Sequence, residues 1–354
     1  MTQPIAILGM GQLGWMLSRA GERIGASVQL LDPDAPEQPG PNTLISVESE
    51  HWPDNPGTRQ LRAHPGWQNP NALDILPNRI QQKTVLDELQ LPTAPWCRPK
   101  DDDQAKDLHQ TLGPDFLLKR ARGGYDGRGQ LRVKASEATP LPDWKTEAIA
   151  ESAIGFDTEV SLVGARGRDG RCVFYPLTEN YHRQGVLTVS LSQPTRFSAL
   201  QRTAETMLTK LMDHLDYVGL MAMECFLVGD KLLINEIAPR VHNSGHWTQE
   251  GATICQFELH LRALLGWPMP QPETRGTTAM VNLLGMEHQQ EWLAVTGARL
   301  YWYNKAHRPG RKMGHINLQH PEPQRIADWL RELPLPADYD ESRAWALERL
   351  SFEG

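Results

Sequence analysis

The segment from Met221 to Thr248 constrains this chain more than any other. It contains two apolar, β-prone runs joined by the turn Val228-Gly229-Asp230, with Glu224 in the first run and Glu236 in the second. A carboxylate among residues that favour burial must be paired, protonated or bound to a metal ion. Two carboxylates on neighbouring strands can hold a hard divalent cation such as Mg²⁺, which prefers oxygen ligands. We predict a hairpin that carries a cation site; the alternative is a hairpin with two solvated glutamates.

The chain turns polar directly after Glu236. Asn235 offers a further, neutral oxygen ligand beside that acid. The loop that follows carries Arg240, His242, Asn243 and Ser244. This composition indicates an anion site next to the cation site. His242 and His246 have the i, i+4 spacing of some zinc ligands, but no HExxH helix surrounds them, so the pattern does not favour zinc.

A glycine-rich loop, from Gly123 to Gly129, lies between two short β-prone runs. Lys119 precedes it, and Leu131 and Val133 mark the returning run. Glycines allow backbone amides to approach phosphate oxygens closely. A plain hairpin turn is the alternative, but the neighbouring Lys119 favours phosphate binding. The loop is not a P-loop, because no Gly-Lys-Ser/Thr opens a helix after it.

The chain opens with the pattern of a strand, a tight glycine turn and a helix. Pro4 to Leu8 is apolar, GMGQLG occupies 9–14, and Trp15 to Ile24 has helical apolar spacing. A second apolar run, from Val28 to Leu31, ends at Asp32. GxGxxG followed by an acid is close to the dinucleotide-binding fingerprint. On this segment alone, an NAD-dependent oxidoreductase is an alternative.

Three ranges are predicted as structural units. Residues 1–94 hold the βαβ opening, a strand over 43–47 that leads to Glu48 and Glu50, and a helix over 78–89 capped by Asn78. The proline-spaced LPTAPWCRP marks a linker, so 95–155 is a second unit, with the glycine loop and a strand through 148–151. Residues 156–354 hold the acidic hairpin, a helix over 197–215 and a small terminal segment.

Composition fits a soluble cytoplasmic enzyme. The 354 residues include 36 basic and 43 acidic side chains, a net charge of −7, which provides no electrostatic footprint for nucleic acid. The sequence contains no run of eighteen apolar residues, so it predicts no membrane span. The first residues lack the pattern of a secretory leader. The four cysteines are scattered singly, which favours reduced thiols over disulfides or zinc ligands.

Together these residues carry a resemblance to a known superfamily. The motifs are Lys119, GGYDGRGQ at 123–130, Glu151, DTEVSLV with Glu159, ENYHRQG with His182, Glu224, Asn235-Glu236 and APRVHNSGHWT. The chain resembles the ATP-grasp superfamily, and within it the N5-carboxyaminoimidazole ribonucleotide synthetases. The opening GMGQLG, VESEHWP and the late RPGRKMGH extend this resemblance over nearly the whole chain.

The resemblance implies an α/β (α+β) ATP-grasp fold, in which the first domain is a Rossmann-like unit that binds no dinucleotide. It implies Mg²⁺ (or Mn²⁺) at Glu224 and Glu236, with ATP as co-substrate. The expected ATP-binding residues are Arg79, Lys119, Gly124, Tyr125, Asp126, Gly127, Arg128, Gly129, Gln130, Glu151, Ser152, Ala153, Ile154, Glu159, His182, Asn235 and Glu236. The expected catalytic residues are Arg240, His242, Asn243, Ser244 and Lys305. The expected ribonucleotide-binding residues are Gln12, Leu13, Glu48, Arg311 and Lys312.

The implied reaction is ATP-dependent carboxylation of 5-aminoimidazole ribonucleotide with bicarbonate, through carboxyphosphate, in de novo purine biosynthesis. The family also implies a cytoplasmic homodimer with small-molecule substrates and no nucleic-acid or membrane partner. A related ATP-grasp ligase, such as a formate-dependent glycinamide ribonucleotide transformylase, is the main alternative, against which HNSGHWT argues. A non-catalytic nucleotide-binding protein would be expected to lack the paired acids.

Overall fold

A small parallel sheet forms the start of the chain. The computed structural model of the protein describes residues 3–124, 129–137 and 139–351. The first strands are β1 (Ile5–Leu8), β2 (Val28–Leu31) and β3 (Leu44–Val47), in the order β2-β1-β3. Ile5 pairs with both Val28 and Leu44, as the parallel βαβ pattern requires. The predicted opening is therefore confirmed.

Four helices accompany this first sheet. They are α1 (Gln12–Ile24), α2 (Pro56–Arg62), α3 (Pro70–Ile75) and α4 (Arg79–Glu88). Helix α1 ends where Gly25 takes a left-handed conformation at φ 70°. The Asn78 side chain accepts a hydrogen bond of 3.0 Å from the Ile80 amide, so it caps α4 as predicted. This cap fixes the point from which the Arg79 side chain leaves the helix.

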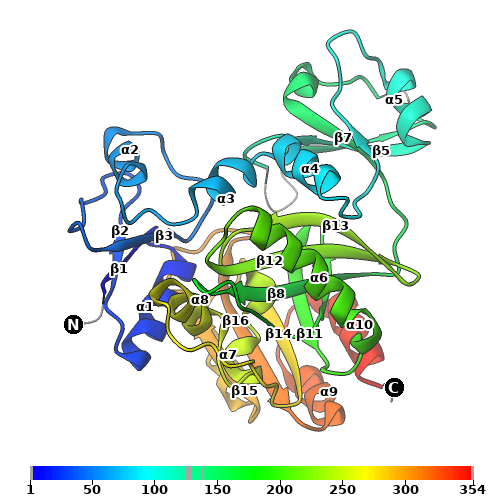
Figure 1. The fold of residues 1–354 in the computed structure, drawn as a ribbon. Helices are drawn as coiled ribbons and strands as arrows, with labels where there is room; N and C mark the ends of the chain where they lie inside the picture. The colour runs from blue at the N-terminus through cyan, green and yellow to red at the C-terminus, as the bar shows by residue number, and fades with distance from the viewer. Residues whose placement is uncertain (1–2, 125–128, 138, 352–354) are drawn as a thin grey trace.

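A second, four-stranded sheet forms a separate lobe, at the upper right in Figure 1. Its order is β4-β7-β5-β6, from β4 (Trp96–Cys97), β5 (Asp115–Arg120), β6 (Gln130–Lys134) and β7 (Ala148–Ser152), with α5 (Ala105–Leu112) and the 3-10 turn η1 (Asp143–Glu147). Phe116, Leu118 and Val133 are buried with Leu108 of α5 in a core of this lobe's own residues. Lys119 pairs with Gln130, which confirms the predicted strand and returning strand.

A large, mostly antiparallel sheet occupies the rest of the chain. In the described residues its strands are β8 (Thr158–Arg166), β9 (Cys172–Phe174), β10 (Thr178–Arg183), β11 (Val186–Ser192), β12 (Gly219–Val228), β13 (Lys231–Ala238), β14 (Thr277–Leu284), β15 (Ala298–Trp302) and β16 (Lys312–His320). Their order is β13-β12-β8-β10-β11-β14-β16-β15, with β9 on β8. The two glutamate-bearing runs form the predicted hairpin, and Gly229 turns it with φ 60°.

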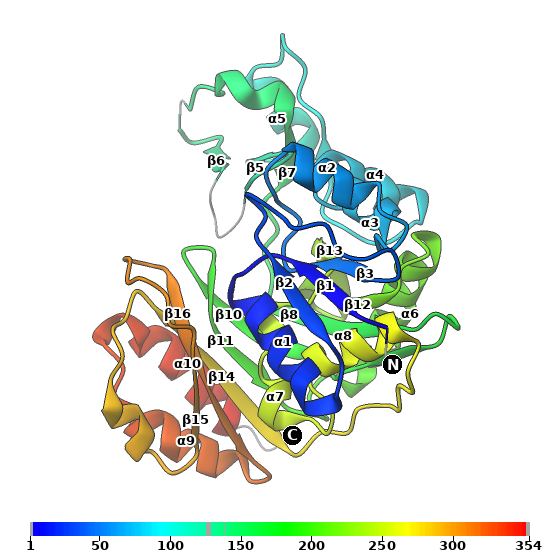
Figure 2. The ribbon, with the colours of Figure 1, turned by 90° about the vertical axis from the view of Figure 1, so that its left-hand side faces the viewer.

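Helices cover both faces of this sheet. They are α6 (Ser198–His214), α7 (Thr248–Gly251), α8 (Gln256–Leu265), α9 (Pro323–Glu332) and α10 (Asp340–Ser351), with 3-10 turns η2 (Asn243–Gly245), η3 (Gln290–Ala294) and η4 (Ala337–Tyr339). Helix α6 packs on the face that contains Leu162 and Met223, and α8 packs on the opposite face at Leu220 and Ala222. Helices α9 and α10 cover the far end, beside β14 and β16 (Figure 2). None of these helices, in the part of the chain that the structure describes, is long and apolar enough to cross a membrane.

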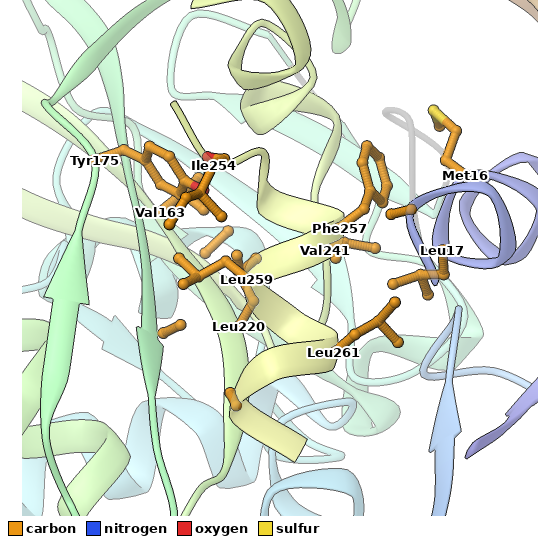
Figure 3. Packing of buried hydrophobic residues seen from close by; sticks show 14 of the residues in the cluster. Met16, Leu17, Val163, Tyr175, Leu220, Val241, Ile254, Phe257, Leu259 and Leu261 are labelled. Carbon is orange, nitrogen blue, oxygen red and sulfur yellow. Dashed lines mark hydrogen bonds between the residues drawn. The ribbon is translucent and has the colours of Figure 1, made fainter. Parts of the chain in front are cut away.

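The first sheet and the large sheet share one hydrophobic core (Figure 3). Met16 and Leu17 of α1 are 2% and 0% exposed and pack toward Phe257 and Leu261 of α8. Full burial of such a side chain contributes about 1.5–3 kcal/mol. These contacts hold the glycine turn that precedes α1 in a fixed place beside the large sheet.

Candidate active site

The paired acids lie just beyond the part of the large sheet that α8 covers. Glu224 on β12 is the register partner of Glu236 on β13, and Ala222 on the same face is already under α8. Their side chains are 21% and 47% exposed. Burial raises the pKa of Glu224 to about 7; His182 opposes that rise and Glu236 adds to it. A bound cation would favour the ionised form of a carboxyl in this position.

A β-bulge aims two neighbouring side chains of β13 at the same region. The register shifts after Glu224, because Cys225 pairs with Ile234 and leaves Asn235 as an extra residue. Asn235 Oδ1 accepts a hydrogen bond of 3.2 Å from Lys119 Nζ. Glu236 Oε1 lies 3.3 Å from Arg79 Nη2. A regular strand would direct these two side chains to opposite faces.

A basic pocket lies next to this bulge, between α4 and the lobe sheet. Glu151 is 2% exposed, contacts Lys83 Nζ through Oε1 and lies 2.6 Å from Lys119 Nζ through Oε2. Burial opposes ionisation of Glu151, but Lys119 and Lys83 outweigh it and lower its pKa. Burial lowers the pKa of Lys83, against the effect of Glu151. Arg79 donates to the carbonyl oxygens of Arg120 and Gly124 at 3.1 and 2.5 Å.

Lys83 is a site residue that the sequence patterns did not predict. It is 2% exposed and lines the same cavity as Arg79, Lys119 and Glu236. Its position four residues after Arg79 on one helix was the available signal, because i and i+4 share a helix face. A lysine on a predicted helix is usually solvated, so this spacing alone did not indicate a pocket.

Glu159 and His182 meet across two strands. His182 Nδ1 lies 3.2 Å from Glu159 Oε2, with Glu159 on β8 and His182 on β10. Burial opposes protonation of His182, but the contact with Glu159 outweighs it and raises the pKa of the imidazole. The predicted nucleotide residues therefore include an acid and a histidine that form one polar unit.

The predicted anion loop forms an ion pair with the first domain, between Arg240 and Glu50. Arg240 Nε lies 2.8 Å from Glu50 Oε2 and its Nη1 donates to Val241 O at 3.1 Å. The Asn243 amide nitrogen and oxygen are both buried without a hydrogen-bond partner among the described residues. Buried polar atoms rarely stay unpaired, which indicates a ligand at this point.

His242 connects the loop to the acidic hairpin. Its Nδ1 lies 2.9 Å from Ser244 Oγ, and its Nε2 lies 3.6 Å from Glu224 Oε1. Burial, followed by the charges of Arg240 and Lys312, lowers the pKa of His242 well below its usual range. The neutral imidazole accepts from the Ser244 amide through Nδ1, so its Nε2 can donate a hydrogen bond.

The glycine turn before α1 binds a carboxylate of its own chain. Glu48 accepts hydrogen bonds of 2.7 Å from the amides of Gly11 and Gly14. A side chain at Gly11 would place its Cβ 2.6 Å from Glu48 Oε1, so the Glu48 carboxylate would have to move away from these amides. In dinucleotide-binding domains such amides receive the pyrophosphate. Here an acid takes that place, which disfavours the NAD alternative.

A late basic run, made up of Lys305, Arg308, Arg311 and Lys312, is divided between the surface and the interior. Arg308 is exposed, whereas Lys305, Arg311 and Lys312 are half-buried. Lys305 Nζ contacts Gln12 Oε1 at the start of α1, beside Leu13. Burial, with the charges of Arg311 and Lys312, lowers the pKa of Lys305 to about 8. The structure thus brings the first turn and the late run together.

Several of the predicted ATP-binding residues lie in the glycine loop or at the end of β7. Tyr125, Asp126, Gly127 and Arg128 lie outside the described residues. Gly129 O accepts from the Arg120 amide at 2.9 Å. The backbone of Ser152 and Ala153, which precedes Ile154, bonds to Pro95 and Asp115, where the lobe joins the large sheet.

The fold and the site define an ATP-grasp enzyme. Residues 84–257 match the ATP-grasp domain family, and residues 278–328 match the phosphoribosylaminoimidazole carboxylase C-terminal domain family. The chain is 49% identical to the N5-carboxyaminoimidazole ribonucleotide synthase of Haemophilus influenzae, over 98% of this chain and 97% of that protein. It belongs to the N5-carboxyaminoimidazole ribonucleotide synthase family, ATP-dependent ligases of purine biosynthesis.

Solved structures agree with this assignment. The synthetase from Thermus thermophilus is 38% identical, with a TM-score of 0.82 over 94% of this chain and 99% of that chain. The synthase from Aspergillus clavatus, solved in complex with ADP and 5-aminoimidazole ribonucleotide, is 24% identical, with a TM-score of 0.79 over 94% of this chain and 98% of that chain. The latter likeness concerns the fold. The predicted family and ATP-grasp fold are therefore confirmed.

Proposed function

We propose that the cleft beside Glu224 and Glu236 carries out the ATP-dependent carboxylation of 5-aminoimidazole ribonucleotide. The observation that carries this proposal is the register pairing of the two acids between a basic pocket and an anion loop. ATP, bicarbonate and the ribonucleotide are the substrates, and ADP and phosphate leave with the carboxylated product.

The chemistry of the donor set fits a divalent cation. Glu224 and Glu236 are adjacent carboxylates, Asn235 adds an amide oxygen, and burial makes an uncompensated charge at Glu224 costly. Mg²⁺ or Mn²⁺ would be held by these two acids together with ATP phosphates. When bound, the ion would neutralise charge on the transferring phosphoryl group.

The chain's own residues would hold ATP on the lobe side of the acids. Arg79 and Lys119 lie within 3.3 Å of Glu236 and Asn235, so they can neutralise the same phosphates that these residues approach. Glu159 would bind the ribose hydroxyls, beside His182. The glycine loop would cover the phosphates and exclude water, which would otherwise hydrolyse the acyl phosphate. The backbone at 151–154 would border the adenine.

Bicarbonate would bind in the loop of Arg240, His242, Asn243 and Ser244. Its oxygen attacks the γ-phosphorus of ATP, forms carboxyphosphate and releases ADP. The 5-amino group of the ribonucleotide then attacks the carboxyl carbon, or the CO₂ released from carboxyphosphate, and phosphate leaves. Nε2 of neutral His242 can donate a hydrogen bond here, and the unpaired Asn243 amide offers a donor and an acceptor.

The ribonucleotide would lie between the first turn and the late basic run. Gln12, Leu13 and Glu48 form one side, and Lys305, Arg311 and Lys312 form the other. The contact of Lys305 with Gln12 supports a single pocket made by both. Several cations suit a phosphate dianion.

We also propose the division 1–94, 95–155 and 156–354, each range containing one sheet. The shared core of the first and last ranges and the separate core of the middle range support this division. From the family we propose a cytoplasmic homodimer without nucleic-acid or membrane partners.

The proposal can be tested by measuring which acid and which amine the protein uses as substrates with ATP. ADP release should require bicarbonate and 5-aminoimidazole ribonucleotide together, with stoichiometric carboxylated product. Formate with glycinamide ribonucleotide should not replace them, and NADH absorbance should not change. ADP release that depends on formate instead would establish the transformylase alternative.

Lys305 should give the reaction an alkaline limit. Its pKa of about 8 means that the charge is present below that pH and lost as pH rises through it. We expect kcat/KM for the ribonucleotide, which reports the free enzyme, to fall above about pH 8. Lys305→Arg should move this fall to higher pH, because arginine stays protonated. An identical profile in both proteins would contradict this role of Lys305.

The late basic run should recognise the substrate phosphate. We expect Arg311→Ala combined with Lys312→Ala to raise the KM for the ribonucleotide at least about 30-fold, since two charged contacts are lost, and the KM for ATP less than about threefold. The double variant should also lose its preference over the dephosphorylated nucleoside. Arg308→Ala, at an exposed position of the same run, is the matched control. An unchanged preference would mean that the phosphate binds elsewhere.

A further inference from the structure

A buried histidine outside the proposed binding set contacts Tyr303, which lies near Lys305, and Gln249, which lies shortly after the anion loop. His315 lies on β16 and is 0% exposed. Its Nδ1 lies 2.6 Å from the Tyr303 hydroxyl and its Nε2 lies 2.9 Å from Gln249 Oε1. An amide oxygen can only accept, so Nε2 carries the proton and Nδ1 accepts from the Tyr303 hydroxyl. Burial lowers the pKa of His315 to about 3, which keeps the ring neutral.

On one side, Tyr303 supports Lys305. Asn304, between them, is in the left-handed region at φ 52°, a conformation that asparagine tolerates better than most residues. The chain therefore reverses and brings Lys305 Nζ to 5.3 Å from the centre of the Tyr303 ring. The Tyr303 amide also donates to Met313 O at 3.0 Å. The Tyr303 ring and Gln12 Oε1 thus both border the Lys305 ammonium.

On the other side, Gln249 belongs to helix α7, which directly follows the anion loop. Its Nε2 lies 3.7 Å from Met16 Sδ on α1. The Tyr301 ring stacks on His315 at 4.6 Å with an interplanar angle of 3°, and its hydroxyl donates to Glu250 Oε1 at 2.7 Å. Two neighbouring residues of α7 are therefore held by one aromatic cluster on β15 and β16.

We infer that His315 is a positioning residue that couples the ribonucleotide end of the cleft to its bicarbonate end. It holds Tyr303 beneath Lys305 and, through its other nitrogen, holds α7 behind the loop of Arg240 to Ser244. His315 itself contacts no substrate in this arrangement. The inference rests on the proposed role of Lys305 in substrate binding. Loss of the coupling should let carboxyphosphate form while the amine is misplaced, so that water consumes it.

Tyr303→Phe tests this coupling, because it removes one hydroxyl and keeps the ring beneath Lys305. We expect the KM for the ribonucleotide to rise about 5- to 10-fold, the effect of leaving a buried acceptor unpaired. The KM for ATP should change less than about twofold. ADP released per carboxylated product should rise above one. His315→Gln, which can replace only part of the bonding, should change the same two quantities.

Tyr339→Phe is the matched control. The Tyr339 hydroxyl is also buried; it donates to Asn282 O at 2.7 Å and accepts from the Leu284 amide at 2.8 Å, so it bonds to the backbone of β14 and not to His315 or α7. This variant should keep the parent's KM values and a ratio of one at a similar melting temperature. A Tyr303→Phe protein with the parent's KM and ratio would overturn the coupling, and so would equal changes in both variants. A parent protein that does not use bicarbonate and the ribonucleotide would instead refute the proposed function.

Discussion

Glu236→Gln is expected to lower turnover at least about 100-fold. Glutamine keeps the size of the side chain and can still accept a hydrogen bond from Arg79, but it removes one of the two charges that would hold the cation. Turnover should be measured at saturating ATP over a range of Mg²⁺ concentrations. Added Mg²⁺ should recover only part of the loss.

The fold should survive this change. Glu236 is 47% exposed and its pair with Arg79 is a single contact of 3.3 Å, so the free energy of unfolding should change by less than about 1 kcal/mol. Glu22→Gln, at the exposed pair with Arg19 on α1, is a matched control that should keep full turnover. If Glu236→Gln kept near-parent activity at limiting Mg²⁺, this would contradict a role of Glu236 in binding the metal ion.

Arg240→Ala should reduce bicarbonate-dependent kcat/KM about 100- to 1,000-fold, as the loss of a preorganised donor to a developing anion does. The affinity for ATP should change less than about threefold, because the nucleotide would lie against Lys119 and Arg79 instead. The measurements are ADP release over a bicarbonate titration and a direct nucleotide titration. Equal losses in both would contradict separate sites.

The contact with Glu50 requires a second variant. Without Arg240, the 10%-exposed Glu50 side chain loses its counter-charge, which should destabilise the protein by about 1–3 kcal/mol. Glu50→Gln combined with Arg240→Ala should restore most of this stability, because the uncompensated charge is gone, yet it should not restore bicarbonate use. Restored activity in the double variant would show that Arg240 acts only through the fold.

Local patterns predicted the elements of this protein well. The glutamate hairpin, the Asn78 cap and the strands around the glycine loop are each encoded within about twenty residues, and each is found in the structure. Periodicity of two, a capping side chain and turn glycines act on neighbouring residues. The first turn was ambiguous for the same reason, since GxGxxG specifies a tight turn but not what its amides bind.

The tertiary arrangement determines which charges meet. Lys83 is 68 residues from Glu151, Arg240 is 190 residues from Glu50, and Lys305 is 293 residues from Gln12. No spacing rule in one sequence connects such positions. The bulge that brings Asn235 and Glu236 to one side also arises only when β13 pairs with β12.

The chain's own pattern therefore supplies the hairpin acids, the glycine loop and the polar loop, because local propensities and residue chemistry act over a few positions. Tertiary packing determines which groups meet. It brings a second lysine to Glu151, two backbone amides to Glu48 and two hydrogen-bond partners to His315. Those partners set charge and orientation, since burial and close approach are properties of the folded chain alone.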